Sequence, residues 1–317
     1  MTREITALHA EALPAGVVTC GAALTSAGVA VVKLGPPGAP PFAILKVTAT
    51  VEGKRLLQRE MAALTALHGD ERLDGWRDLL PRPRGHGVLA GHSYRLDSAL
   101  HGRPMTAPTR AARHAVMSAA AETIAVLHRQ TAGTVAGGPE VAERWVDAPL
   151  RELSCRARRS RWVAYRIERL RDELHDAVGA GTLAAARIHG DYWLGNLLFS
   201  GTQSPTGIVD WEASAPLEPP FHDVLHLLLY TRRLVTGAEL GQMLHDQLRG
   251  IGWSAEERAV MNRHWEWPPD GTLSERHMLL LYWLRHAAGH ARQQGSPAGY
   301  RYRWWERRNV LPVLESL

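Results

Sequence analysis

The residues best suited to chemistry lie in two short segments, 189–196 (HGDYWLGN) and 208–212 (IVDWE). Asp191 and Asn196 are separated by four residues, so one tight loop can point both side chains to the same side. The turn-rich stretch after Asn196 predicts a short hairpin, which returns the chain and brings Asp210 beside Asn196. An amide and a carboxylate on neighbouring segments are suitable oxygen ligands for Mg2+.

The chemistry that this set favours is phosphoryl transfer, which needs oxygen ligands to hold magnesium on the phosphates and a carboxylate near the acceptor hydroxyl. Asn196 and Asp210 are the predicted metal ligands, and Asp191 is the predicted base or hydroxyl-orienting group. The order and interval of these three residues match the catalytic loop of kinases. The alternative is a polar turn whose side chains only satisfy backbone groups.

A second charged pair lies upstream. Lys46 is one of only three lysines in the chain and ends the apolar strand pattern 42–46. Glu60 falls on the apolar stripe of a helix predicted over 52–68, where a carboxylate is costly unless it is paired. We therefore expect an ion pair that holds the Lys46 ammonium against the α- and β-phosphates of a nucleotide. The alternative is that the two residues are not paired. Lys46 would then extend from an edge strand into solvent, and Glu60 would lie at the margin of the apolar stripe.

Two regions of different character must position these residues. Apolar runs between Gly and Pro clusters predict that the first hundred residues are mainly β with one helix, whereas helical spacing dominates from residue 104 onward. The segment 97–102 is the predicted hinge. We therefore predict an α+β, bilobal fold, with a small β-rich nucleotide-binding lobe (1–100) and a larger, mainly helical lobe (101–317) that carries the catalytic loop and the acceptor site.

The composition indicates an ordinary globular protein, with 45% hydrophobic residues among 317. The uncharged stretch 12–32 is too rich in Gly, Thr and Ser for a membrane span, so we expect two strands there. Two cysteines cannot form a disulfide framework, which fits a reducing cytoplasm. The net charge is +5, but arginines occur throughout the chain, and no nucleic-acid partner is expected. The densest basic run, 156–171, predicts a helix with a solvated face or, alternatively, a site for an anionic partner.

The two chemical segments, together with Asp223 in the motif PFHDVL (220–225), resemble the aminoglycoside phosphotransferase (choline kinase-like) family. The phrase LHGRP (100–104) and the helix end AVLH (125–128) are similar to that family as well. The resemblance implies a protein-kinase-like fold, with ATP or GTP as phosphoryl donor and Mg2+ as cofactor.

The resemblance also implies roles for individual residues. It implies that Asp191 is the catalytic aspartate, that Asn196 and Asp210 are metal ligands, and that Lys46 anchors the phosphates with Glu60 as its partner on the helix. It places the nucleotide base at the hinge, with Asp97 and Ala99 as the contact positions, and makes His189 and Asp223 supports of the catalytic loop. Asp223 also has a plainer interpretation, as the N-cap of a helix predicted over 224–231.

The chain departs from the family pattern at two places. Trp193 and Leu194 stand where the family loop usually carries histidine and proline, which bears on the substrate class more than on the reaction. The expected phosphate loop, 21–28, is poor in glycine and matches neither GxGxxG nor a Walker A sequence. Thr25, Ser26 and backbone amides would therefore have to cover the phosphates.

Two histidine pairs, His222/His226 and His286/His290, are each spaced by one helical turn and suggest a metal. Neither pair has an obvious third ligand or a following glutamate base, as a zinc enzyme would require. We therefore expect no zinc site.

The acceptor is constrained mainly by charge. Polycationic sugars favour a carboxylate-rich pocket, yet the last third of the chain is rich in Arg and Trp, as in the segment 300–308 (YRYRWWERR). Trp304 and Trp305 are candidates to line a pocket for an aromatic, nucleoside-like or anionic acceptor, although core packing explains most of the tryptophans.

These observations favour an O-phosphotransferase that acts on a small hydroxylated natural product or antibiotic. One alternative is a peptide Ser/Thr kinase of ribosomal peptide maturation, because the basic helix and the aromatic tail could also grip a peptide. Another is a non-catalytic, kinase-like scaffold. The presence of Lys46, Asp191, Asn196 and Asp210 together disfavours it.

Overall fold

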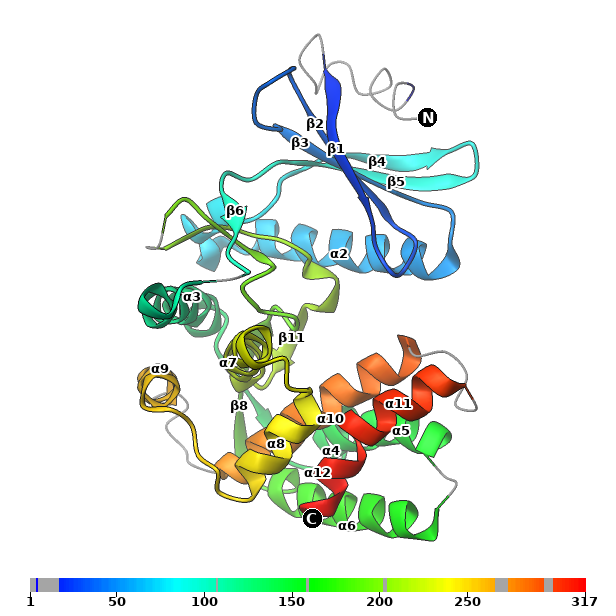
Figure 1. Ribbon diagram of the computed structural model, residues 1–317, viewed down its shortest axis with the longest axis vertical. Helices are drawn as coiled ribbons and strands as arrows, with labels where there is room; N and C mark the ends of the chain where they lie inside the picture. The colour runs from blue at the N-terminus through cyan, green and yellow to red at the C-terminus, as the bar shows by residue number, and fades with distance from the viewer. Residues whose placement is uncertain are drawn as a thin grey trace. The chain divides into compact units, whose positions relative to one another are not determined.

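The computed structural model describes Glu4 and residues 17–106, 108–157, 160–201, 204–265, 273–293 and 299–317. The chain divides into two compact units, a β-rich one and a helical one (Figure 1). The first unit comprises Met1–Met105, His189–Asp191 and Gly195–Ala215, and the second comprises Thr106–Ile188, Tyr192–Leu194 and Pro216–Leu317. The predicted boundary near residue 100 assigned the whole catalytic loop to the helical part. By their contacts, most residues of 189–215 group instead with the β-rich unit.

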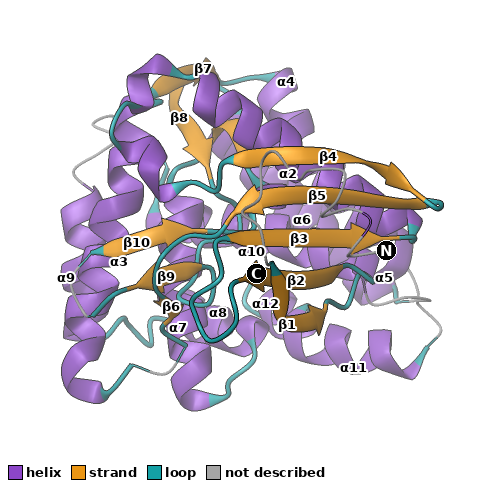
Figure 2. Cartoon of the chain, turned by 90° about the horizontal axis from the view of Figure 1, so that it is seen from above, coloured by secondary structure: helices purple, strands orange, loops and turns teal. Residues whose placement is uncertain are grey.

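A five-stranded antiparallel sheet organises the first unit (Figure 2). In spatial order its strands are β1 (Val18–Leu24), β2 (Ala30–Gly35), β3 (Ala43–Thr48), β5 (His92–Ser98) and β4 (Pro83–Leu89). The strands that the apolar and β-branched runs predict are therefore present. The uncharged stretch contributes β1 and β2 to this sheet.

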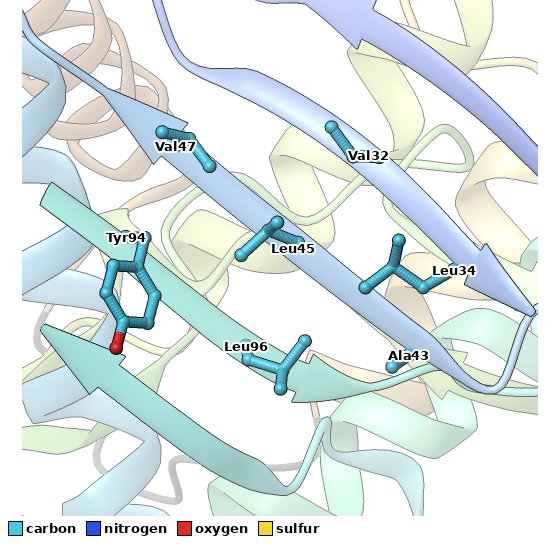
Figure 3. Packing of buried hydrophobic residues seen from close by; sticks show 7 residues of the cluster. All are labelled: Val32, Leu34, Ala43, Leu45, Val47, Tyr94 and Leu96. Carbon is cyan, nitrogen blue, oxygen red and sulfur yellow. The ribbon is translucent and has the colours of Figure 1, made fainter. Parts of the chain in front are cut away.

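Side chains alternate between the two faces of the sheet. One face carries an apolar cluster, in which Leu45 lies beside Val32 and Leu96 of the neighbouring strands (Figure 3). Lys46, the next residue along β3, therefore points to the opposite face, where it is aligned with Arg95 of β5. Because a slip of one residue would reverse every side chain, the apolar cluster fixes the register that places these two cations side by side.

Helix α2 (Val51–Gly69) runs along the sheet (Figure 1). Thr50 caps its N-terminus, since the Thr50 hydroxyl accepts a hydrogen bond from the Gly53 amide at 3.0 Å. The stripe predicted from spacing is buried and consists of Leu57, Glu60, Leu64 and Leu67. Two short 3-10 turns follow α2, η1 (Glu71–Leu73) and η2 (Trp76–Leu79).

A second, three-stranded sheet completes the first unit. It contains β6 (Arg103–Pro104), β9 (Leu197–Phe199) and β10 (Pro205–Ile208), in the order β10-β9-β6. The hairpin predicted after Asn196 is confirmed, because β9 and β10 pair antiparallel. The next turn, η4 (Trp211–Ala213), packs against α2. These contacts explain why the segment after the catalytic loop belongs to the β-rich unit.

The second unit is mainly helical, as predicted. Its helices are α3 (Arg110–Gln130), α4 (Pro139–Ala142), the π-helical turn η3 (Glu143–Asp147), α5 (Ala148–Ala157), α6 (Arg161–Val178), α7 (Phe221–Thr236), α8 (Leu240–Leu248), α9 (Ala255–Trp265), α10 (Glu275–Gln293), α11 (Tyr300–Asn309) and α12 (Leu311–Glu315). A small sheet in the order β11-β8-β7 joins β7 (Gly133–Ala136), β8 (Thr182–Ile188) and β11 (Ala215–Glu218). No helix within the described ranges is long and apolar enough to cross a membrane.

The basic run 156–171 does not form the single helix predicted for it. The run is divided between the end of α5 and the start of α6, because Ser160 is extended (φ −128°, ψ 132°). Arg158 and Arg159 lie outside the described residues. In α6 the buried residues recur every three to four positions, so the remaining arginines occupy the solvated face.

The apolar cluster supports the register of β3, and we expect Leu45→Ala to destabilise the protein by about 2–5 kcal/mol, because a fully buried leucine leaves a cavity. Urea denaturation followed by tryptophan fluorescence measures the loss. Val88→Ala is the matched control, because Val88 is 69% exposed, and we expect a change within about 0.5 kcal/mol. Equal effects of the two substitutions would contradict this account of the core.

Candidate active site

The predicted ion pair between Lys46 and Glu60 is present. The Lys46 Nζ lies 2.9 and 2.8 Å from the two carboxylate oxygens of Glu60 and 2.7 Å from Oδ1 of Asp210. The side chains of Lys46 and Glu60 are only 12% and 3% exposed, which excludes the alternative of a snorkelling lysine. Burial acts to lower the pKa of Lys46, but the charges of Glu60 and Asp210 outweigh it and raise the pKa, so the ammonium stays charged.

Arg95 is a second buried cation that sequence reasoning missed. Its Nη1 lies 3.2 Å from Glu60, while its Nε and Nη2 contact the Asp97 carboxylate at 2.8 and 2.7 Å. Glu60 therefore carries one cation on each side. The register of β3 and β5, which aligns Arg95 with Lys46, is the signal that could have identified it.

The two predicted hinge contacts are engaged within the first unit. The Asp97 carboxylate binds Arg95, and burial raises the pKa of Asp97, although its hydrogen bond to Arg95 opposes the rise. The Ala99 amide donates to the Phe42 carbonyl at 2.8 Å. In this structure the Asp97 side chain therefore serves the ion network of the sheet, and contact of Asp97 and Ala99 with a nucleotide stays a prediction.

The predicted catalytic loop, 189–196, is held by hydrogen bonds between its own residues and to the Val209 carbonyl. Asn196 Nδ2 donates to the backbone carbonyl and to Oδ2 of Asp191, both at 2.9 Å. His189 donates through Nε2 to the Val209 carbonyl at 2.9 Å and accepts the Asp191 amide on Nδ1 at 3.2 Å. His189 thus bonds to both segments, and its role as a support of the catalytic loop stays a prediction. Gly190 has φ +85°, and a Cβ there would collide with the Ala213 carbonyl oxygen, so the glycine is required.

Asp210 lies beside this loop in a conformation that few residues adopt. Its backbone is left-handed (φ 65°, ψ 62°), which costs free energy unless its neighbours hold it. The Val209 amide donates to the Asn196 carbonyl at 2.9 Å, so the two predicted metal ligands lie on neighbouring segments. On the other side Trp211 is fully buried, donates to the Ile208 carbonyl at 2.9 Å and packs against the His189 ring at 4.5 Å.

Glu212 is a further acidic residue that sequence reasoning did not single out. Carboxylate oxygens of Glu60, Asp210 and Glu212 lie within 4.8 Å of one another, close enough to hold one metal ion. Burial and then the charges of Asp210 and Glu60 raise the pKa of Glu212 to about 7. This excess of negative charge and the all-oxygen donor set fit a hard divalent cation such as Mg2+. The sequence signal was present, because Glu212 ends the IVDWE segment.

The turn between β1 and β2 contains the two predicted phosphate contacts, Thr25 and Ser26. Both residues are exposed. Thr25 closes the turn, since its amide donates to the Val29 carbonyl at 2.9 Å and its hydroxyl accepts the Val29 amide at 3.1 Å. Ser26 lies at the tip, where its side chain can meet a ligand without breaking the turn.

Asp223 belongs to the second unit and is not a helix N-cap. Helix α7 begins at Phe221, so Asp223 lies inside its first turn, where its carboxylate contacts His128 Nε2 at 2.9 Å. Both residues are buried. Burial, and then the charge of Asp223, raise the pKa of Tyr192, whose hydroxyl donates to the Ala120 carbonyl at 2.7 Å. A supporting role of Asp223 in the catalytic loop stays a prediction.

The two histidine pairs of the sequence form one layer with tyrosines between α7 and α10. His226 stacks on His286 with ring centres 4.3 Å apart and packs on Tyr230 at 4.0 Å. Tyr230 in turn contacts Trp193 of the catalytic segment at 5.9 Å, and its hydroxyl lies 3.3 Å from Nε2 of His290. Rings thus continue without a break from Trp193 into the core of the second unit. Among the described residues, these imidazoles belong to no cluster with metal-binding geometry.

The C-terminal tryptophans divide into core and surface residues. Trp305 is buried against Tyr302, whereas Trp304 is 41% exposed with the Arg308 guanidinium 4.4 Å above its ring. Trp283 is also buried and donates to the Asn309 carbonyl at 2.8 Å. The Trp265 side chain and Trp267 lie outside the described residues. Of the two candidates for an acceptor pocket, only Trp304 presents a ring to solvent.

Comparison with known proteins identifies the family of the chain. A family model described as the phosphotransferase enzyme family matches residues 25–261. No curated protein sequence matches the chain closely enough to count as a relative.

Several solved structures are similar in fold. Aminoglycoside phosphotransferase APH(3'')-Id from Streptomyces rimosus ATCC10970 has a TM-score of 0.56 at 17% identity, covering 90% of this chain and 97% of its own. Aminoglycoside-3'-phosphotransferase of type VIII has a TM-score of 0.54 at 21% identity, with coverage of 91% and 98%. Aminoglycoside phosphotransferase APH(4)-Ia has a TM-score of 0.56 at 13% identity, with coverage of 99% and 97%. At these identities the likeness shows the fold, and it confirms the predicted α+β, protein-kinase-like class.

The histidine layer predicts an acid-sensitive fold. Burial, then the neighbouring His226, His290, His222 and Arg285, hold the pKa of His286 well below its usual value. Below about pH 6.5 His286 binds a proton in the unfolded chain but not in the folded chain. The free energy of unfolding therefore falls as the pH falls. We expect the free energy of unfolding to decline from pH 7.5 to 5.5.

In His286→Phe the free energy of unfolding should decline less steeply with falling pH than in the wild type. The difference in slope should be at most about 1.4 kcal/mol per pH unit. Urea denaturation at each pH measures it. His86→Phe, at an exposed histidine, is the control and should leave the slope unchanged. A wild-type stability that does not change over this range would contradict the buried, neutral state of His286.

Proposed function

The chain belongs to the phosphotransferase enzyme family, and from this membership we propose that it transfers the γ-phosphoryl group of ATP or GTP to a hydroxyl group of a small molecule. Membership also confirms the predicted class of enzyme, a phosphotransferase with an alcohol group as acceptor. The observation that carries the proposal is the convergence on the Lys46 ammonium of two carboxylates, Glu60 and Asp210, within 3 Å.

We propose that the nucleotide binds to the β-rich lobe, which the predicted division places at residues 1–100. Lys46 has three N–H donors, which face two oxygens of Glu60 and one of Asp210. Glu60 would keep the ammonium oriented, and the donor that Asp210 releases when it holds the metal would face the α- and β-phosphates. Asn196, Asp210 and Glu212 would hold Mg2+, which would neutralise charge on the phosphates when it is bound. Thr25, Ser26 and the amides of their turn would cover the phosphates, and the nucleotide base would lie near Asp97 and Ala99.

Asp191 serves the acceptor. Its Oδ2 is fixed by the Asn196 amide at 2.9 Å, so the carboxylate holds one orientation toward an incoming hydroxyl. The acceptor oxygen attacks the γ-phosphorus, the bond to the β–γ bridging oxygen breaks, and the nucleoside diphosphate leaves. The hydroxyl proton passes to Asp191. His189 contributes by holding the Asp191 amide, and Asp223 by its contact with His128.

Similar structures support a nucleotide donor and an antibiotic-like acceptor. APH(3'')-Id was determined with ADP and streptomycin, and a thermostable mutant of APH(4)-Ia with ADP and hygromycin B. A cytoplasmic location fits both the donor, which the cytoplasm supplies, and the low cysteine content.

The acceptor itself, we infer, is aromatic or anionic rather than polycationic. Trp193 follows Asp191 by two residues in the catalytic segment, and we infer that its ring contributes to the acceptor site. The layer behind Trp193 consists of tyrosines and histidines, and burial keeps the pKa of His222 and of His286 well below their usual values. The Arg233 guanidinium lies 5.6 Å from the centre of the Tyr230 ring. These rings and the Arg233 guanidinium favour an acceptor with an aromatic face or a negative charge.

Asp191→Ala should abolish transfer, by at least about a hundredfold, while leaving binding of Mg·ADP largely intact, because general-base catalysis contributes about that much. Asp210→Ala should instead impair turnover through the metal, with a weaker response to added Mg2+. Incubation with ATP and a panel of hydroxylated compounds, followed by mass spectrometry for one added phosphoryl group, measures transfer; calorimetry measures Mg·ADP. Asp176→Ala, at an exposed aspartate of α6, is the control. Undiminished activity of Asp191→Ala would overturn the mechanism.

Trp193→Ala should raise the KM of an aromatic acceptor about tenfold and leave the KM of ATP unchanged, because a lost ring contact is worth about 1.4 kcal/mol. The panel pairs phenyl glycosides and nucleosides with streptomycin and hygromycin B. Trp162→Ala is the matched control, since Trp162 is 39% exposed on α6. If Trp304→Ala raises the KM and Trp193→Ala does not, the acceptor contacts α11. Preferred turnover of the aminoglycosides would refute the acceptor class.

A further inference from the structure

Two threonine hydroxyls, one at the end of β3 and one at the N-cap of α2, bind the turn between β1 and β2. Thr48 Oγ1 donates to the Gly28 carbonyl at 2.9 Å, and Thr50 Oγ1 donates to the Ala27 carbonyl at 2.8 Å. Two successive carbonyls of the turn are therefore held by side chains of another segment. Thr48 is only 2% exposed, so its bond is shielded from water. We call Thr48 and Thr50 the threonine clasp.

The clasp also binds the start of α2. The Thr50 hydroxyl accepts the Gly53 amide at 3.0 Å, and the Thr48 hydroxyl accepts the Thr50 amide at 3.2 Å. A carbonyl can only accept, so a hydroxyl that bonds one donates its single proton to it. The two hydroxyls also lie 3.1 Å from each other. Each hydroxyl thus donates to the turn and accepts from the helix end, so the clasp ties the two together.

Glycines make room for this arrangement on both sides. Gly28 has φ +75°, and a Cβ there would lie 2.8 Å from Thr50 Cγ2. A Cβ at Gly53 would collide with the Thr48 hydroxyl. The turn and the helix therefore approach the clasp more closely than any residue with a side chain would allow.

We propose that Thr48 and Thr50 are positioning residues for the nucleotide phosphates. The inference rests on the proposed function, in which the turn at Thr25 and Ser26 covers the phosphates. A turn poor in glycine lacks the run of close backbone amides that defines a glycine-rich phosphate loop. Here the threonine clasp, which lies outside the turn, holds the turn in one position.

The clasp connects the three parts that must meet the phosphates together. Lys46 precedes Thr48 by two residues on β3, and Glu60 lies on the helix that Thr50 caps. When the clasp is formed, the turn, the ammonium and the carboxylate that orients it keep one geometry. Its loss frees the turn while leaving Asp191 and Asn196 in place, so nucleotide affinity should suffer more than the rate of transfer.

The test uses Thr48→Val, which keeps the shape and removes the hydroxyl, and Thr48→Ser, which restores it. We expect Thr48→Val to weaken Mg·ADP binding in calorimetry and to raise the KM of ATP, each about tenfold, with kcat changed less than threefold. Thr48→Ser should recover most of the affinity. Thr123→Val is the matched control, because the Thr123 hydroxyl also donates to a backbone carbonyl, at 2.8 Å on α3. It should leave both quantities unchanged.

Hydrogen exchange gives a readout that needs no turnover. In Thr48→Val, the amides of residues 25–29 and 51–54 should exchange faster together, because one clasp holds both. If the wild type binds Mg·ADP and Thr48→Val binds it equally well, or if Thr48→Ser fails to rescue, the clasp has no positioning role. A wild type that binds no nucleotide would overturn the proposed function as well, so the two failures are distinguishable.

Discussion

The buried carboxylate of Glu60 is the constraint around which the β-rich unit is built. It is 3% exposed and lies between the Lys46 ammonium and the Arg95 guanidinium. Loss of either cation would leave a buried charge poorly compensated, at a cost of about 3–5 kcal/mol. Because the three groups come from α2, β3 and β5, this one charge fixes the helix against the sheet. The apolar cluster on the other face sets the register that delivers both cations to it.

The chemistry of the two units differs in kind. The first gathers carboxylates and compensating cations around Lys46, an arrangement suited to a metal and to phosphates. The second continues from Trp193 into tyrosines and buried imidazoles, and burial holds the pKa of His222 and of His286 well below its usual value. The catalytic segment 189–196 crosses from one environment to the other, since Asp191 groups with the first unit and Trp193 with the second. A phosphoryl donor and a less polar acceptor would thus each meet a suitable set of side chains.

Much of the fold and the central part of the site were predictable from the sequence. A carboxylate on an apolar stripe requires a partner, which led from Glu60 to Lys46, and the interval from Asp191 to Asn196 is typical of a phosphotransfer loop. Arg95 escaped notice because periodicity shows that a strand has two faces but not which face a helix covers. The histidine layer escaped because helical spacing pairs residues within a helix and carries no information on which helices meet.

The contact between Lys46 and Asp210 has a consequence for the order in which the enzyme is loaded. In this structure the Lys46 ammonium lies 2.7 Å from the Asp210 carboxylate that the proposed Mg2+ would use. A bare cation would have to displace a lysine that keeps only Glu60 as its partner. A cation that arrives on a triphosphate brings the lysine a new anion in exchange. The internal ion pair would therefore disfavour the metal alone and favour the metal–nucleotide complex, so that the proposed donor and cofactor would enter together.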